Sequence, residues 1–244
     1  MIAILGSGAV GALVAAELTR AGVATTLVTT ERSVEAIGRE GVRVSSPRFG
    51  EHTVAVAATT HLEDAPEVLV LAVKAPHLHA ALGRVAGDPG VVVPLLNGVE
   101  HLAALRERFP RVVAGTVRVQ AHREGLTHVV HRAPFLTITL APPGAPVLVT
   151  ALAAADIDAV RGASEIDVLW AKLSRLAAIA LATTAADAPL GEVRETAEAV
   201  AREVAIVANA EGAPIDADVV VQELRDLPDG ATSSLRADVT SGAR

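Results

Sequence analysis

Four short motifs carry the residues that could act on a small molecule. The segment ILGSGAVGA places Gly6, Gly8 and Gly11 in a GxGxxG pattern. Lys74 follows the apolar run EVLVLAV, and Asn97 follows VVVPLL. Lys172 lies in WAKL, within a long apolar stretch that includes Trp170 and Arg175. Such glycine patterns bind phosphates, and a desolvated lysine can donate a proton or stabilise negative charge.

The glycine pattern meets the structural conditions for dinucleotide binding, because it follows an apolar strand and opens a helix. Gly6 permits the tight turn, Gly8 lets a pyrophosphate approach the backbone, and Gly11 allows the helix to pack closely on the strand. The helix N-terminus offers N–H groups to the phosphates. An ordinary glycine turn is the alternative, and this context favours the binding interpretation. The predicted cofactor-binding residues of the loop are Gly6, Ser7, Gly8, Ala9, Val10 and Gly11.

The segment VTTERS, residues 28–33, follows the second expected strand and bears on the choice of cofactor. An acidic residue there binds the ribose of NAD, whereas an arginine favours NADP. Glu31 and Arg32 both lie near this place, and the neighbouring threonines and Ser33 could bond a 2′-phosphate. We predict NADP with Arg32 as a cofactor-binding residue. NAD stays open as the alternative, and so does a solvated loop arginine.

These motifs need elements to position them, and the first half of the chain alternates apolar runs with helical periodicity. This alternation predicts an α/β fold, a Rossmann-type doubly wound parallel sheet covered on both faces. Lys74 and Asn97 would stand at strand ends, where open sheets bind ligands. The expected strands are residues 2–5, 24–28, 67–73 and 91–95, a hairpin of 42–45 and 53–57, and the expected helices are 9–21, 33–40, 76–86 and 100–108.

The pattern changes after Pro110. Residues 112–119, 127–131 and 135–140 read as strands that extend the sheet, followed by a helix at 147–155 and a strand at 156–160. Beyond residue 165 the pattern is helical, over 166–185, 191–211 and 216–226. We predict a dinucleotide-binding domain over residues 1–163 and an all-helical C-terminal domain, for substrate and dimerisation, over residues 164–244.

Composition excludes several classes of function. The chain has 244 residues, no cysteine, 2% aromatic residues and a net charge of −7. Thiol chemistry is therefore excluded, and a nucleic-acid partner is not expected. No segment shows about 20 uninterrupted apolar residues, so we expect no membrane association and a cytoplasmic protein. The histidine spacings fit no metal motif, and no metal site is predicted.

The four motifs together resemble the ketopantoate reductase (2-dehydropantoate 2-reductase) family. GAVGALVAAEL, EGLTHVVH and the late SSLRAD, residues 233–238, add to the resemblance, which covers essentially the whole chain. It implies a Rossmann domain followed by a helical domain, with a small 2-oxo acid bound in the cleft between them. It also implies NADPH-dependent reduction of 2-dehydropantoate to pantoate for pantothenate synthesis. A homodimer is compatible with it.

Matched motif by motif, the resemblance assigns roles to four residues. Lys172 corresponds to the catalytic lysine, Lys74 and Asn97 to residues near the nicotinamide and substrate, and Ser234 to a substrate contact. Hydride addition to a ketone builds negative charge on oxygen, which a lysine can stabilise and protonate. Taken singly, Lys74 reads as a surface lysine and Asn97 as part of a plain turn.

The chain departs from the family pattern at residues expected to bind substrate. Leu176 and Ala180 stand where the family has asparagines, and Leu190 where some members have another. Loss of such donors weakens recognition of a substrate hydroxyl. A smaller or more apolar oxo acid is therefore the alternative substrate, with Arg175 read as a solvated charge. The family's TEID-like motif would fall about two residues beyond Arg244, so we expect a C-terminal segment carrying its glutamate to be missing. A non-catalytic NADP(H)-binding protein is the alternative from another class.

Overall fold

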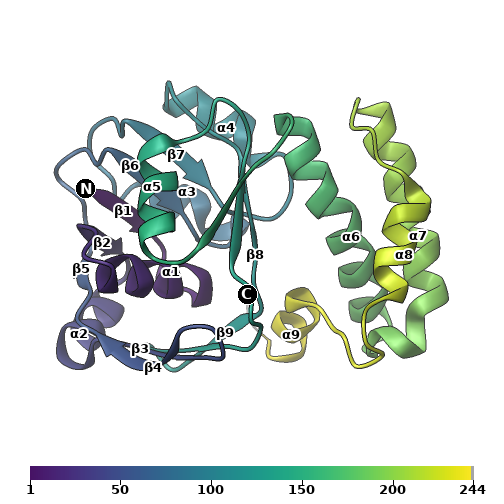
Figure 1. Ribbon diagram of the computed structural model, residues 1–244, viewed down its shortest axis with the longest axis horizontal. Coiled ribbons are helices and arrows are strands. Elements are labelled where there is room, and N and C mark those ends of the chain that lie inside the picture. Colours follow the sequence, from purple (N-terminus) through teal and green to yellow (C-terminus); the bar gives the residue numbers. More distant parts are fainter. Residues whose placement is uncertain (243–244) are drawn as a thin grey trace. The chain divides into compact units, whose positions relative to one another are not determined.

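The computed structural model describes residues 1–242, and its chain divides into two compact units, Met1–Glu165 and Ile166 onward (Figure 1). The first unit contains all the strands of the described residues. The second consists of helices. A parallel five-stranded sheet followed by a helical region is the predicted fold class, which is confirmed.

A five-stranded sheet forms the centre of the first unit. All its pairings are parallel, in the order β5-β2-β1-β6-β7. Strands β1, β6 and β7 are buried at every residue, which explains their uninterrupted apolar sequences. The strands are β1 (Ile2–Leu5), β2 (Thr25–Val28), β5 (Ala57–Thr59), β6 (Val68–Leu71) and β7 (Val91–Pro94).

Successive residues of these strands face opposite cores. Ile2 and Ile4 of β1 pack into one core, with helices α1 (Ala9–Arg20) and α5 (Pro146–Ala154). Ala3 and Leu5 pack into the other, with α3 (Leu78–Leu82) and α4 (His101–Arg108). The period of two along a strand therefore places helices on both faces. A short 3-10 turn (Ala75–His77) precedes α3, and α2 (Glu31–Glu40) follows β2.

Apart from an isolated parallel bridge between Val112 and Val92 of β7, the later strands do not extend this sheet, so that part of the prediction is wrong. They form a sheet of order β4-β3-β10-β9 and another of order β12-β11-β8. Helix α1 contacts β3, β4, β9 and β10, and so lies between the central sheet and the first of these. The predicted hairpin is present as β3 (Val42–Ser46) and β4 (Gly50–Val54), but its second strand begins three residues before the expected 53–57. The other strands are β8 (Gly115–Arg118), β9 (Ala121–Glu124), β10 (His128–His131), β11 (Thr137–Leu140) and β12 (Asp158–Arg161).

The second unit is built on three helices, α6 (Glu165–Ala185), α7 (Leu190–Ala210) and α8 (Ala217–Arg225), which confirm the predicted ones to within a residue. Its core is rich in alanine, including Ala178 and Ala182 of α6 against Ala197 and Ala201 of α7. Small side chains permit close packing of helices, and α7 and α8 are the most closely packed pair of this unit. A fourth helix, α9 (Ser234–Thr240), was not predicted and is capped by Ser233, whose hydroxyl accepts from the Arg236 amide at 3.1 Å.

Helix α6 corrects the expectation that no segment has the length and composition of a membrane span. It has 21 residues, and its most apolar window has a mean hydropathy of 1.3 with 44% of the window buried. Alanine and leucine raise the hydropathy although lysine and arginine interrupt the sequence. The buried core helix of a soluble protein meets the same two criteria, so the helix is weak evidence for a membrane.

Candidate active site

The loop between β1 and α1 needs two of its glycines for the fold itself. Gly6 has a φ of +108°, and a β-carbon there would lie 2.8 Å from Val73 Cγ1 and 2.9 Å from the Ala72 carbonyl oxygen. A β-carbon on Gly11 would lie 2.0 Å from the Gly6 carbonyl oxygen. All three distances are shorter than van der Waals contact. The tight turn and the close packing of α1 on β1 thus account for Gly6 and Gly11.

Gly8 has no such internal requirement. Its φ is −63°, which any residue adopts, and the nearest atom to an added β-carbon would be the Ala72 carbonyl oxygen at 3.8 Å. Gly8 is exposed and is the N-cap of α1, whose first turn holds no acidic residue. Among the described residues, no side chain caps this helix end. Open space beside an uncapped helix N-terminus fits the pyrophosphate of a dinucleotide.

Ser7 connects the glycine loop to the end of β2 and to a different sheet. Its buried hydroxyl lies 2.6 Å from the Thr29 hydroxyl. Arg123 of β9 donates through Nη1 to the Ser7 carbonyl oxygen and, at 3.2 Å, to the Ser7 hydroxyl. Arg123 was not among the predicted site residues, and no strand was expected over residues 121–124.

Lys74 and Asn97 lie at the same edge of the central sheet as the glycine loop. Lys74 follows β6 and Asn97 follows β7, and both are exposed. Since β1, β6 and β7 are adjacent and parallel, their carboxyl ends meet at one edge. Gly98, next to Asn97, has a φ of +89° that turns the chain after β7. The topology therefore brings three of the predicted motifs together.

Two arginines lie at the end of β2, where a cofactor's ribose would bind. Arg32 is exposed in the first turn of α2, one residue before the buried Ser33. Arg84 was not predicted to belong to the site. Its Nη1 donates to the carbonyl oxygens of Thr29, at 3.1 Å, and Thr60, at 3.2 Å. The ends of β2 and β5 thus hold a half-buried guanidinium that is distant in sequence.

Lys172 lies two turns into α6, inside the helix expected over residues 166–185. Its side chain is half-buried, and burial lowers its pKa to about 8, with the nearby charge of Arg175 as the second cause. Arg175 forms an ion pair of 3.7 Å with Glu223 of α8. A lysine with this pKa can give up a proton near neutral pH.

Leu176 and Ala180 follow Lys172 on the same side of α6, at intervals of one helical turn. Leu176 is half-buried and Ala180 is buried, and neither side chain can form a hydrogen bond. Ser234 is the exposed first residue of α9, whereas the buried Ser233 hydroxyl lies 3.0 Å from that of Thr183. The polar groups of this unit therefore differ from those that the resemblance implies.

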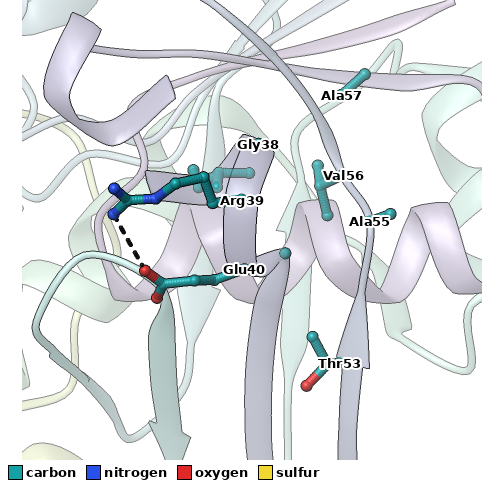
Figure 2. Close-up of a pocket in the computed structure, with 9 residues that line it drawn as sticks. Gly38, Arg39, Glu40, Thr53, Ala55, Val56 and Ala57 are labelled. Atoms are coloured by element: carbon teal, nitrogen blue, oxygen red, sulfur yellow. Dashed lines mark hydrogen bonds and ion pairs between the residues drawn. The ribbon is translucent and has the colours of Figure 1, made fainter. Parts of the chain in front are cut away.

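A pocket on the surface of the first unit lies away from the glycine loop. It has a volume of about 620 Å³ and is open to solvent between α2 and the start of β5 (Figure 2). Its charged residues, Arg39 and Glu40, form an ion pair of 3.3 Å with one another. None of the predicted site residues lines this pocket. Within residues 1–242, no group of three or more His, Cys, Asp or Glu side chains could hold a metal ion.

The fold is thus an α/β unit of the dinucleotide-binding type followed by helices, and comparison with known proteins specifies its family. The sequence profile of the ketopantoate reductase PanE/ApbA family matches residues 2–143, more than half of the chain. The chain therefore belongs to this family of oxo-acid reductases.

Three relatives illustrate the similarity. The 2-dehydropantoate 2-reductase of Archaeoglobus fulgidus is 29% identical, over 100% of this chain and 85% of its own length. A PanE/ApbA family ketopantoate reductase structure from Ralstonia eutropha JMP134 is 28% identical, with a TM-score of 0.86 over 100% of this chain and 86% of that one. D-mandelate dehydrogenase with NADH and anilino(oxo)acetate shares the fold at 21% identity, with a TM-score of 0.87 and the same coverage.

Proposed function

We propose that this protein reduces a 2-oxo acid to a 2-hydroxy acid with NADPH, with 2-dehydropantoate as the substrate and pantoate as the product. The observation that carries the proposal is the space beside Gly8 at the uncapped N-terminus of α1. The fold itself does not require a glycine there, whereas a bound pyrophosphate would. The family's other members support the oxo acid as substrate.

In the proposed mechanism, a nicotinamide cofactor supplies the hydride when bound. The backbone N–H groups of Ala9 and Val10 would bind its phosphates at the start of α1. Lys172 would donate a proton to the carbonyl oxygen of the substrate as negative charge develops there. Lys74 and Asn97 would orient the nicotinamide and the substrate from the ends of β6 and β7. Ser234 would contact the substrate.

The test of this reaction is oxidation of NADPH with 2-dehydropantoate and with a panel of other 2-oxo acids. We expect turnover with the wild-type protein and a loss of about 100-fold or more in Lys172→Ala, because a general acid contributes about that factor. Arg202→Ala is the control, because it removes an exposed positive charge of α7 that does not affect the pKa of Lys172. Undiminished turnover in Lys172→Ala would contradict the assigned role.

The preference for NADPH over NADH is supported by the cations at the end of β2. Arg84 Nη1 is held 3.1 Å from the Thr29 carbonyl oxygen, and Arg32 is the second residue of α2. A 2′-phosphate would gain charge-assisted bonds from such groups. We expect Arg32→Gln and Arg84→Gln to weaken NADPH binding by about tenfold each while changing NADH binding little. Equal effects on both cofactors would refute this basis for the preference.

Reduction of a different, more apolar oxo acid is the second candidate function of this protein. Leu176 and Ala180 favour it, because they cannot bond a substrate hydroxyl from α6. In the same panel, a strong preference against 2-dehydropantoate would select this candidate. Tight NADPH binding without any turnover would instead favour a binding protein without catalysis.

A cytoplasmic homodimer is the setting that we propose for this activity. Light scattering after size-exclusion chromatography tests the dimer, and partition between soluble and membrane fractions tests the location. A monomer, or recovery with membranes, would contradict the respective part of the proposal.

A further inference from the structure

Arg123 connects a strand of the second sheet to the glycine loop. It lies on β9, 116 residues after Ser7, and bonds both the carbonyl oxygen and the hydroxyl of that residue through Nη1. Ser7 stands between Gly6 and Gly8, so the guanidinium lies next to the part of the loop where Gly8 leaves open space. A guanidinium has five N–H donors in a planar arrangement. The two bonds to Ser7 use only one of its nitrogens.

The charge of Arg123 is not balanced by an acid within the described residues. No ion pair of residues 1–242 includes it, whereas Arg48 pairs with Asp158 at 2.7 Å and Arg106 with Glu165 at 2.5 Å. The side chain is half-buried, and burial lowers its pKa while no carboxylate raises it. Holding an unpaired cation away from water costs free energy. A bound anion would offset that cost.

We propose that Arg123 binds the pyrophosphate of the dinucleotide and holds Ser7, and with it the glycine loop, in the binding conformation. The proposal rests on the proposed function, because it needs a dinucleotide at this loop. Arg123 suits the ligand, since its planar donors match the oxygen atoms of a phosphate. Its position also adds positive charge beside the N-terminal end of α1, where the helix dipole already favours an anion.

The test compares Arg123→Gln, Arg123→Lys and a control, Arg132→Gln, in the full chain. Arg132 is an exposed arginine that follows β10, and its replacement makes the same change in net charge. ADP-ribose is the first probe, because it contains the pyrophosphate and lacks the nicotinamide. We expect its Kd to rise about 10- to 100-fold in Arg123→Gln, less in Arg123→Lys, and to stay unchanged in the control.

Two further measurements separate pyrophosphate binding from other roles. The binding of NADPH and the binding of NADH should weaken by the same factor in Arg123→Gln, because both cofactors contain the pyrophosphate. The dependence of Kd on salt concentration should also become shallower than in the wild type, since a charge that contacts the ligand has been removed. Arg123→Lys keeps the charge and should keep the salt dependence.

Several results would overturn the inference. Unchanged ADP-ribose binding in Arg123→Gln would show that the guanidinium does not contact the ligand. Weaker binding with an unchanged salt dependence would reduce Arg123 to a structural brace for Ser7. If Arg123→Gln raised only the KM of the oxo acid, Arg123 would instead bind the carboxylate of the substrate. By contrast, a wild-type protein that binds neither ADP-ribose nor NADPH would refute the proposed function.

Discussion

At the scale of single residues, the environment of Lys172 decides what this lysine can do. An exposed lysine has a pKa of about 10.4 and rarely gives up a proton at neutral pH. Burial on α6, with Arg175 one turn away, lowers the pKa of Lys172 to about 8. The group therefore changes protonation state within the range in which an enzyme works. This property belongs to the packing around the side chain rather than to the residue type.

The lowered pKa predicts how the reaction depends on pH. Reduction consumes a proton, so it needs Lys172 protonated, which holds below a pKa of about 8. The protonated fraction is about nine-tenths at pH 7 and about one-tenth at pH 9. We expect kcat for reduction to fall as pH rises through 8, and the reverse oxidation to rise over the same range. The pH profile of kcat with saturating NADPH measures this.

A second variant controls for other groups that titrate in the same range. Arginine stays protonated throughout, so Lys172→Arg should retain whatever activity it has with a flat profile. A wild-type rate that stays constant up to pH 10 would exclude Lys172 as the proton donor. A fall near pH 8 that persists in Lys172→Arg would assign the titration to a different group.

At the scale of elements, the glycines of the segment from β1 to α1 have different structural reasons. Gly11 has no room for a methyl group, because a β-carbon would lie 2.0 Å from the Gly6 carbonyl oxygen. Gly8 has room, because the closest atom would be 3.8 Å away. One glycine is thus needed by the packing of helix on strand and the other is left for a ligand. The GxGxxG pattern by itself does not separate these two causes.

This difference predicts opposite effects of two substitutions to alanine. We expect Gly11→Ala to lower the free energy of unfolding by about 3 kcal/mol or more, because the helix must move off the strand. Gly8→Ala should change stability by less than about 1 kcal/mol and weaken NADPH binding by at least about tenfold. Denaturant unfolding and fluorescence titration measure the two quantities. Normal NADPH binding in Gly8→Ala would show that no ligand backbone approaches there.

At the scale of the whole molecule, a cofactor that binds only the folded chain must raise its stability. At a concentration of NADPH about 100 times its Kd, the gain is about 2.7 kcal/mol. For a unit the size of Met1–Glu165, this corresponds to a rise of about 5–10 °C in Tm. Differential scanning calorimetry should therefore show this shift in the transition of the first unit. With binding weakened tenfold, Gly8→Ala should gain only about 1.4 kcal/mol at the same concentration, which is about half of the wild-type shift. An unshifted wild type would argue against dinucleotide binding.

Much of this architecture could be predicted from sequence because its signals are local. The uninterrupted apolar runs of β1, β6 and β7 indicate strands that are buried on both faces. The periodicity of α6, α7 and α8 indicates helices to within a residue. The glycine loop could be found for the same reason, since its strand, turn and helix are consecutive.

The errors of prediction arose where partners are distant in sequence. Strand β9 has the sequence AHRE, which is not typical of strands, and it forms by pairing with β10. The later strands were assigned to the central sheet because a period of two shows that a strand exists without showing which strand it pairs with. Helix α1 lies between the central sheet and the sheet of β4, β3, β10 and β9, and only the tertiary packing reveals this.

The sequence by itself determined most of the helices and strands, the dinucleotide-type loop and the family, because each depends on residues that are close together in the chain. The tertiary structure decided which charges meet that loop. Arg123 reaches Ser7 across 116 residues, and Arg84 reaches Thr29 across 55. It also decided that Gly11 serves the fold while Gly8 leaves space, and that Lys172 is desolvated. Steric clearance and burial depend on atoms brought together from distant segments, and a local pattern does not record them.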